Sequence, residues 1–295
     1  MDVAGFGESS IDHVYVVDGL PLSGVSKLRI VSHHSSSGGQ VATTMAACAA
    51  LGLRAAYLGV IGTDENGQRV ERELRDRGVD TTRTIRRTAP NRYAVILVDR
   101  SSGERTVFWE RDGRLDVPPA EINLALVAGA RVVHVDATDE LASIALARAA
   151  REAGAAVTCD IDEVTPRTAE LLAHVNIPVL AEQVPRMLTG VDGIEAALRE
   201  LRRGHDGVLY VTLGAAGSAA LEGSRFVHDP GRPVNAVDTT GAGDVFRAGV
   251  IYGIVREWPT ETTLRFANAA AAVSCTRSSA MSSVPSLADV ERHLR

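Results

Sequence analysis

A glycine-rich turn that ends in a carboxylate is the part of this sequence best suited to chemistry. The segment Asp238-Thr239-Thr240-Gly241-Ala242-Gly243-Asp244 leads directly into a helix-like apolar run over residues 245–255. Backbone N–H groups at a helix N-terminus lack partners inside the helix and carry partial positive charge, so they favour a bound phosphate. Asp244 would repel that phosphate, and we therefore expect it to act as a general base that deprotonates an attacking hydroxyl.

The composition is typical of a single α/β domain and argues against several classes of partner. The chain has 295 residues and a net charge of -6, and its arginines are scattered, which argues against a nucleic-acid partner. No apolar run reaches the roughly 18 residues that a membrane span needs, and residues 1–10 do not resemble a signal peptide. Cys48, Cys159 and Cys275 lie far apart in apolar runs, so we expect reduced packing residues in a cytoplasmic protein.

Two common nucleotide-binding motifs are missing. Lys27 is the single lysine, so the sequence holds no G-x-x-x-x-G-K-[ST] loop and no strand lysine of the protein-kinase type. Gly5-Phe6-Gly7 resembles the start of a dinucleotide fingerprint, but Ser10 stands where the third glycine would be. A dinucleotide-dependent oxidoreductase is therefore a weaker hypothesis than a phosphoryl-transfer enzyme.

Apolar strands alternate with helices along most of the chain, which predicts a mostly parallel sheet covered on both faces. The expected strands are residues 3–6, 56–61, 132–135, 156–161, 178–180, 207–213 and 218–221. The expected helices are residues 40–51, 64–77, 140–153, 168–174, 194–203, 242–255 and 262–276.

Two strand pairs do not fit this alternation. Residues 13–17 pair with 28–33, and residues 92–99 pair with 104–110 around a turn at 100–103. We interpret them as a small β lid built from two separate segments, about 12–34 and 92–111, of a single domain spanning residues 1–295. Phe108 and Trp109 are expected to pack inside this lid.

In four segments the chain resembles the ribokinase-like (PfkB) carbohydrate kinases. These are residues 7–12 (GESSID), Gly38-Gly39 followed by Leu51-Gly52, residues 212–217 (TLGAAG), and residues 238–244 with Phe246. The resemblance implies a Rossmann-like three-layer α/β/α sandwich with a mostly parallel central sheet and a small β-sheet lid. It implies ATP as donor, Mg²⁺, a monovalent cation such as K⁺, transfer to a sugar hydroxyl, and a homodimer formed through the lids.

The resemblance also assigns roles to individual residues. Asp244 would be the catalytic base, and the N–H groups of Gly241, Ala242 and Gly243 would form the anion hole. The expected sugar-binding residues are Ser10, Asp12, Gly38, Gly39 and Thr43, and the expected nucleotide-binding residues are Thr212, Gly214, Gly217 and Asn268. Asn268 would face the adenine or else lie on an ordinary helix surface, and Gly214 and Gly217 would otherwise form a plain hairpin turn. No protein metal ligand is expected, because Mg²⁺ would be carried by the ATP phosphates.

The sequence departs from the family pattern in three motifs. Thr43 stands where the family has Asn after the diglycine. Ala181 and Val184 replace the Asn and Glu of an Asn-x-x-Glu motif, with Glu182 between them as a substitute if the register shifts. Ser279 replaces a glycine near the C-terminal ATP loop. A non-catalytic sugar- or nucleotide-binding relative therefore stays an alternative to the kinase.

The acceptor is predicted to be a small neutral sugar of the ketohexose or pentose type. The lid hairpin before Phe108 resembles that of ketohexokinases and 2-keto-3-deoxygluconate kinases. A carboxylate would require paired arginines, and only Arg111 lies near the relevant place. A phosphorylated sugar would require basic residues beside the diglycine, where Gln40 stands. Kinases of 2-keto-3-deoxygluconate or of a nucleoside remain the alternatives.

Overall fold

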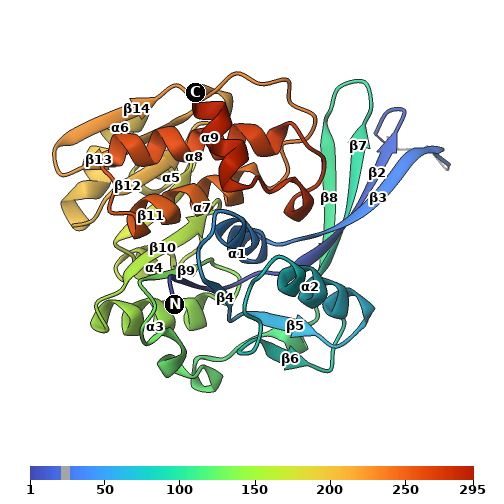
Figure 1. Ribbon diagram of the computed structural model, residues 1–295, viewed down its shortest axis with the longest axis horizontal. Coiled ribbons are helices and arrows are strands. Elements are labelled where there is room, and N and C mark those ends of the chain that lie inside the picture. Colours follow the sequence, from blue (N-terminus) through green and yellow to red (C-terminus); the bar gives the residue numbers. More distant parts are fainter. Residues whose placement is uncertain (21–26) are drawn as a thin grey trace.

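The computed structural model describes residues 1–20 and 27–295 and is built around an eight-stranded sheet (Figure 1). The strand order is β14-β13-β12-β11-β10-β9-β1-β4, in which the strands from β12 to β4 run parallel, β13 pairs antiparallel with β12, and β14 pairs antiparallel with β13. The strands are β1 (Val3–Phe6), β4 (Ala55–Tyr57), β9 (Val132–Val135), β10 (Ala156–Ile161), β11 (Ile177–Ala181), β12 (Leu209–Thr212), β13 (Ser218–Glu222) and β14 (Arg225–Asp229).

Helices cover both faces of this sheet, because its central strands are apolar on both sides. Val3 of β1 packs into a core with α1 (Gln40–Ala50), α7 (Ala242–Val255), α8 (Thr260–Cys275) and α9 (Leu287–Leu294). Its neighbour Ala4 points to the opposite face, into a core that includes α3 (Glu140–Glu152), α4 (Thr168–Leu172) and α5 (Val184–Thr189), with α6 (Ile194–Leu201) beside them. The predicted three-layer α/β/α architecture is confirmed.

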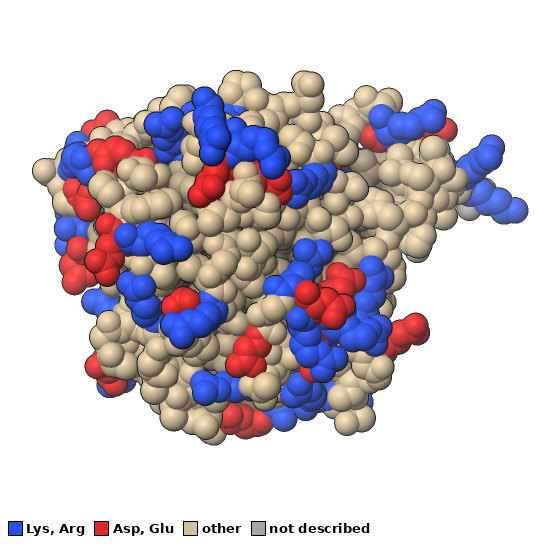
Figure 2. Space-filling model, viewed as in Figure 1, with Lys and Arg blue, Asp and Glu red and all other residues tan. Residues whose placement is uncertain are grey.

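A second sheet projects from this body, to the right in Figure 1. It has the order β3-β2-β7-β8, with β2 (Ser10–Val17), β3 (Ile30–Gly38), β7 (Tyr93–Asp99) and β8 (Arg105–Glu110). The pairs β2–β3 and β7–β8 are antiparallel, and β2 joins β7 in parallel. The two strand pairs of the sequence analysis therefore form one sheet, which we call the lid sheet. Most of it is tan in Figure 2, since few charged side chains cover the visible face.

The expected single strand over residues 56–61 is wrong. The chain leaves the central sheet after β4 and forms β5 (Val60–Gly62), which pairs with β6 (Ile85–Arg87) beside α2 (Glu65–Asp76). The break lies at Gly59, where a Cβ atom would stand 2.4 Å from the Gly7 carbonyl oxygen and 2.3 Å from the Tyr57 hydroxyl. A run of apolar residues does not reveal such a close approach, which only glycine permits.

Four further elements were not predicted: β6, β14, α5 and α9. Each is short, and β14 is held in the sheet by its pairing with β13, which the sequence pattern of β14 alone does not indicate. Within the described residues, no helix combines the length and apolar character that crossing a membrane requires.

Candidate active site

The turn before α7 leaves backbone donors free at the N-terminus of a long helix. Gly241 caps α7 with φ 79°, and a Cβ atom there would lie 2.9 Å from the Cα atom of Ala280. The N–H of Ala242 donates to the Thr239 carbonyl at 3.2 Å, whereas those of Gly241 and Gly243 donate no hydrogen bond within the described part of the chain. Two of the three expected donors are therefore available to an anion, and the third is engaged by the turn itself.

Asp244 lies in the first turn of α7, half-buried beside these donors. Its carbonyl oxygen accepts a hydrogen bond from the Thr44 hydroxyl of α1 at 3.3 Å, which joins the two helices at the site. Burial raises the pKa of Asp244 well above its usual range, the Asp160 carboxylate raises it further, and Arg247 opposes both. A carboxyl group with a raised pKa suits a general base that works near neutral pH.

The loop before Gly241 is fixed by Asp238. This carboxylate accepts hydrogen bonds from the N–H groups of Thr240 and Ser279, both at 2.9 Å. Ser279 has φ 75°, a conformation that favours glycine, which agrees with the glycine expected at this position. Arg105 of the lid sheet donates to the Thr240 hydroxyl at 3.3 Å, and both residues line a cavity of about 530 Å³.

The structure brings four of the expected sugar-binding residues together where the lid sheet meets α1. The Ser10 hydroxyl donates to Asp12 at 3.0 Å, and a Cβ atom on Gly38 would lie 2.4 Å from an Asp12 carboxylate oxygen. Gly39 has φ 95°, and its Cβ atom would lie 2.5 Å from the Cα atom of Ser9. Burial raises the pKa of Asp12. The diglycine is therefore required by the close approach of two chain segments.

Thr43, the fifth residue of this set, is fully buried in α1. Its hydroxyl has no hydrogen-bond partner among the described residues, whereas the neighbouring Thr44 joins α1 to α7. A sugar contact by Thr43 stays a prediction.

The expected nucleotide-binding residues belong to the end of β12, to the β12–β13 turn and to α8. A Cβ atom on Gly217 would lie 2.1 Å from the Asp229 carbonyl oxygen, and the Asn268 amide donates to the Asp229 carboxylate at 2.7 Å. Gly214 opens the turn with φ 56°, and the Thr212 hydroxyl points to the Leu180 carbonyl at 3.5 Å. Asn268 is buried, so its interpretation as ordinary helix surface is wrong.

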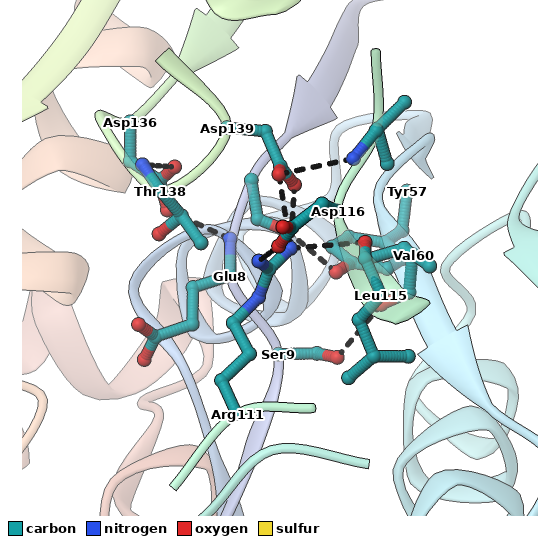
Figure 3. A network of polar contacts seen from close by, with 12 residues as sticks. Glu8, Ser9, Tyr57, Val60, Arg111, Leu115, Asp116, Asp136, Thr138 and Asp139 are labelled. Carbon is teal, nitrogen blue, oxygen red and sulfur yellow. Dashed lines mark hydrogen bonds and ion pairs between the residues drawn. The ribbon is translucent and has the colours of Figure 1, made fainter. Parts of the chain in front are cut away.

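A network of acidic residues that sequence reasoning missed lies at the carboxyl ends of β1 and β9 (Figure 3). The Glu8 N–H donates to Asp136 at 2.7 Å, and Asp136 also accepts from the Thr138 N–H at 2.9 Å. Arg111 pairs with Asp139 at 2.8 Å. The signal was available, because polar residues at the carboxyl ends of parallel strands often form binding sites.

The Glu8 carboxylate points away from this network in Figure 3 and pairs with Arg92 at 3.0 Å. The Arg92 guanidinium also lies 5.4 Å from the ring centre of Trp109. Together with Gln40 and Arg111, these residues line a cavity of about 660 Å³. The expected packing of Phe108 and Trp109 inside the lid is wrong, because their side chains are 56% and 65% exposed on β8, an edge strand of the lid sheet.

Comparison with known proteins identifies the class of enzyme to which this chain belongs. The chain matches the model of the pfkB family of carbohydrate kinases over residues 2–287, and it belongs to that family. The predicted enzyme class, an ATP-dependent carbohydrate kinase, is confirmed. The oxidoreductase hypothesis is thereby set aside.

The names of similar proteins refer to different sugars. Fructokinase-1 of Oryza sativa is 29% identical over 98% of this chain and 96% of its own. The ATP-dependent ribose-1-phosphate kinase of Halopiger xanaduensis is 32% identical over 95% of this chain and 94% of its own. The structure of Arabidopsis thaliana ribokinase complexed with ribose and ATP is 26% identical and superposes with a TM-score of 0.89, covering 100% of this chain and 98% of that one.

Proposed function

We propose that this kinase transfers the terminal phosphoryl group of ATP to a hydroxyl of a small neutral sugar of the ketohexose or pentose type. The observation that carries the proposal is the position of Asp244 directly after the free N–H groups of Gly241 and Gly243. Those donors would stabilise charge on the transferring phosphoryl group while Asp244 accepts the proton of the sugar hydroxyl.

The same turn fits a nucleotide phosphate, since it offers unpaired donors and the partial positive charge of a 14-residue helix. Thr212, Gly214, Gly217 and Asn268 are proposed to hold the rest of the nucleotide. Mg²⁺ is proposed to arrive on the ATP phosphates, whose charge it neutralises. A monovalent cation such as K⁺ near the Asp238 loop stays a prediction.

On the acceptor side, Asp12 is proposed to accept hydrogen bonds from the sugar, with Ser10, Gly38, Gly39 and Thr43 around it. The chain is proposed to be one domain in which the lid sheet closes over the sugar. Closure would exclude water and so limit ATP hydrolysis.

The arginines that could bind an anionic acceptor already form ion pairs with carboxylates of this chain, which supports a neutral acceptor. Arg92 is occupied by Glu8, and Arg111 is occupied by Asp139, Asp116 and the Leu115 carbonyl. Gln40 donates to Asp162 at 2.9 Å and adds no positive charge. A sugar phosphate, as named for the Halopiger relative, would have to displace these carboxylates. The alternatives of 2-keto-3-deoxygluconate and a nucleoside are outcomes of the acceptor assay described below.

A non-catalytic, regulatory relative is the second candidate. It is favoured by Ala181 and Val184, which replace the Asn-x-x-Glu motif, and by Glu182, which is exposed beside them. The intact Asp244 favours the kinase.

The test of the base is Asp244→Asn, with Asp206→Asn as the control because Asp206 is 84% exposed and far from the site. We expect Asp244→Asn to lower turnover by about 10²-fold or more while ATP binding, followed by calorimetry, stays within about twofold. Asp206→Asn should match the wild type. Full turnover in Asp244→Asn would refute the assignment.

The test of the sugar contact is Asp12→Ala. We expect the Michaelis constant for the sugar to rise by about tenfold or more, because the carboxylate accepts charge-assisted hydrogen bonds, and the constant for ATP to stay unchanged. An unchanged sugar constant would remove Asp12 from the site.

A homodimer through the lids is also proposed. Apolar side chains are exposed on both edge strands of the lid sheet, among them Ile30 on β3 and Val107 and Phe108 on β8. Such patches mark interaction sites in proteins of this size. Sedimentation analysis should show a dimer that Phe108→Lys dissociates, and a wild-type monomer at micromolar concentration would refute it.

A further inference from the structure

We propose that Arg247, held by Asp160, is a positioning residue that keeps the base Asp244 and the first turn of α7 in the geometry for phosphoryl transfer. This inference rests on the proposed function, in which Asp244 is the base. Sequence reasoning did not single out either member of the pair.

The guanidinium of Arg247 lies against the anion-binding turn. Arg247 follows Gly243 by four residues and Asp244 by three, so all three share one side of α7. A Cβ atom on Gly243 would lie 2.6 Å from Arg247 Nη1, which means that glycine at this position leaves the room that the guanidinium occupies. A shift of the Arg247 guanidinium would therefore displace the neighbouring backbone at Gly243.

The guanidinium is anchored from another element. Arg247 is 5% exposed, and its Nη2 atom pairs with the carboxylate of Asp160 in β10. Neither carboxylate oxygen of Asp160 has a further hydrogen-bond partner among the described residues, so Arg247 is the one side chain described that pairs with Asp160. Because a buried charge is costly without its partner, Asp160 fixes where Arg247 lies.

The charges around Asp244 explain what this cation does. Asp160 from β10, Glu8 from the β1–β2 turn and Asp12 from β2 are carboxylates that raise the pKa of Asp244, after the larger effect of burial. Arg247 lowers it.

Further groups surround the pair itself. Asp136 and Asp162 face Asp160, and His134 of β9 is neutral because burial, and then Arg247, lower its pKa to about 3. Removing the arginine should therefore make Asp244 harder to ionise, which a purely structural pair would not do.

The experiment compares Arg247→Met, Arg247→Lys and a control, Arg265→Met, on an exposed position of α8. We expect Arg247→Met to lower kcat by about 10- to 100-fold, with the sugar Michaelis constant within about threefold of wild type. The acid limb of the kcat/KM profile should move up by about one pH unit. Arg247→Lys keeps the positive charge, so it should keep the acid limb of the kcat/KM profile at its wild-type position and recover part of kcat. Arg265→Met should match the wild type.

A folded Arg247→Met with kcat within twofold of wild type and an unmoved acid limb would overturn the proposal. If Arg247→Met does not fold, Arg247→Met/Asp160→Asn removes both buried charges together. Positioning predicts a folded double variant with low kcat, whereas a merely structural pair predicts one with wild-type kcat. Asp244→Asn separates the two claims: if it is inactive while the Arg247 variants are normal, the positioning role fails and the base assignment stands.

Discussion

Replacement of Gly39 by alanine tests the close approach that holds the diglycine at the site. The new Cβ atom would lie 2.5 Å from the Cα atom of Ser9 and 2.7 Å from the Glu8 carbonyl oxygen, and both are backbone atoms that cannot rotate away. The φ of 95° costs about 1–2 kcal/mol for a residue with a Cβ atom, and the forced backbone shift costs about 1–3 kcal/mol more. We expect Gly39→Ala to lose about 2–5 kcal/mol of unfolding free energy.

Gly52→Ala is the matched control. Gly52 has φ 90°, but nothing lies within 4 Å of its Cβ position, so only the conformational cost of about 1–2 kcal/mol applies. Urea unfolding followed by circular dichroism gives both values on one scale. The Michaelis constant for the sugar should rise in Gly39→Ala and stay unchanged in Gly52→Ala, because the Glu8-Ser9-Ser10 turn moves in the first variant alone. Equal losses of stability in the two variants would refute the reasoning.

Two further predictions concern the acidic network. Arg111→Met should destabilise the fold by about 3–5 kcal/mol, because it leaves the buried Asp139 carboxylate without its ion-pair partner. Adding Asp139→Asn should recover part of that loss in urea unfolding. No recovery would contradict the pairing. Burial raises the pKa of Glu8 from 4.5 to about 7, so the folded chain binds a proton that the unfolded chain releases. The contribution of Glu8 to stability is therefore fully present below pH 4.5, and at most about 3 kcal/mol of it is lost as the pH rises through 7. Glu8→Gln should lose this slope between pH 4.5 and 7, and an equal slope in wild type and variant would contradict it.

The parts of the site that the sequence predicted are those made by neighbouring residues. The turn before α7, the diglycine and Asp12 depend on residue types at fixed spacing, and the structure brings Ser10, Asp12, Gly38 and Gly39 together as the motifs implied. The alternation of strands and helices likewise predicted the central sheet, because its period is local.

The parts that the sequence did not predict depend on pairs distant along the chain. Glu8, which follows β1, meets Arg92 beside the lid strand β7, and Asp160 of β10 meets Arg247 of α7, only once the whole chain has folded. The exposure of Trp109 depends on β8 having no neighbour on one side. No local pattern in the sequence carries this information.

The most direct measurement of the central claim is ADP release with ATP and Mg²⁺ against a panel of acceptors, with Asp244→Asn as the control. The panel holds fructose and ribose as neutral sugars, 2-keto-3-deoxygluconate and fructose 6-phosphate as anions, and adenosine as a nucleoside. We predict ADP release with a neutral sugar, lost in Asp244→Asn. Release with an anionic acceptor or adenosine alone would contradict the neutral-sugar assignment. Undiminished release by Asp244→Asn would contradict the role of Asp244 as the base.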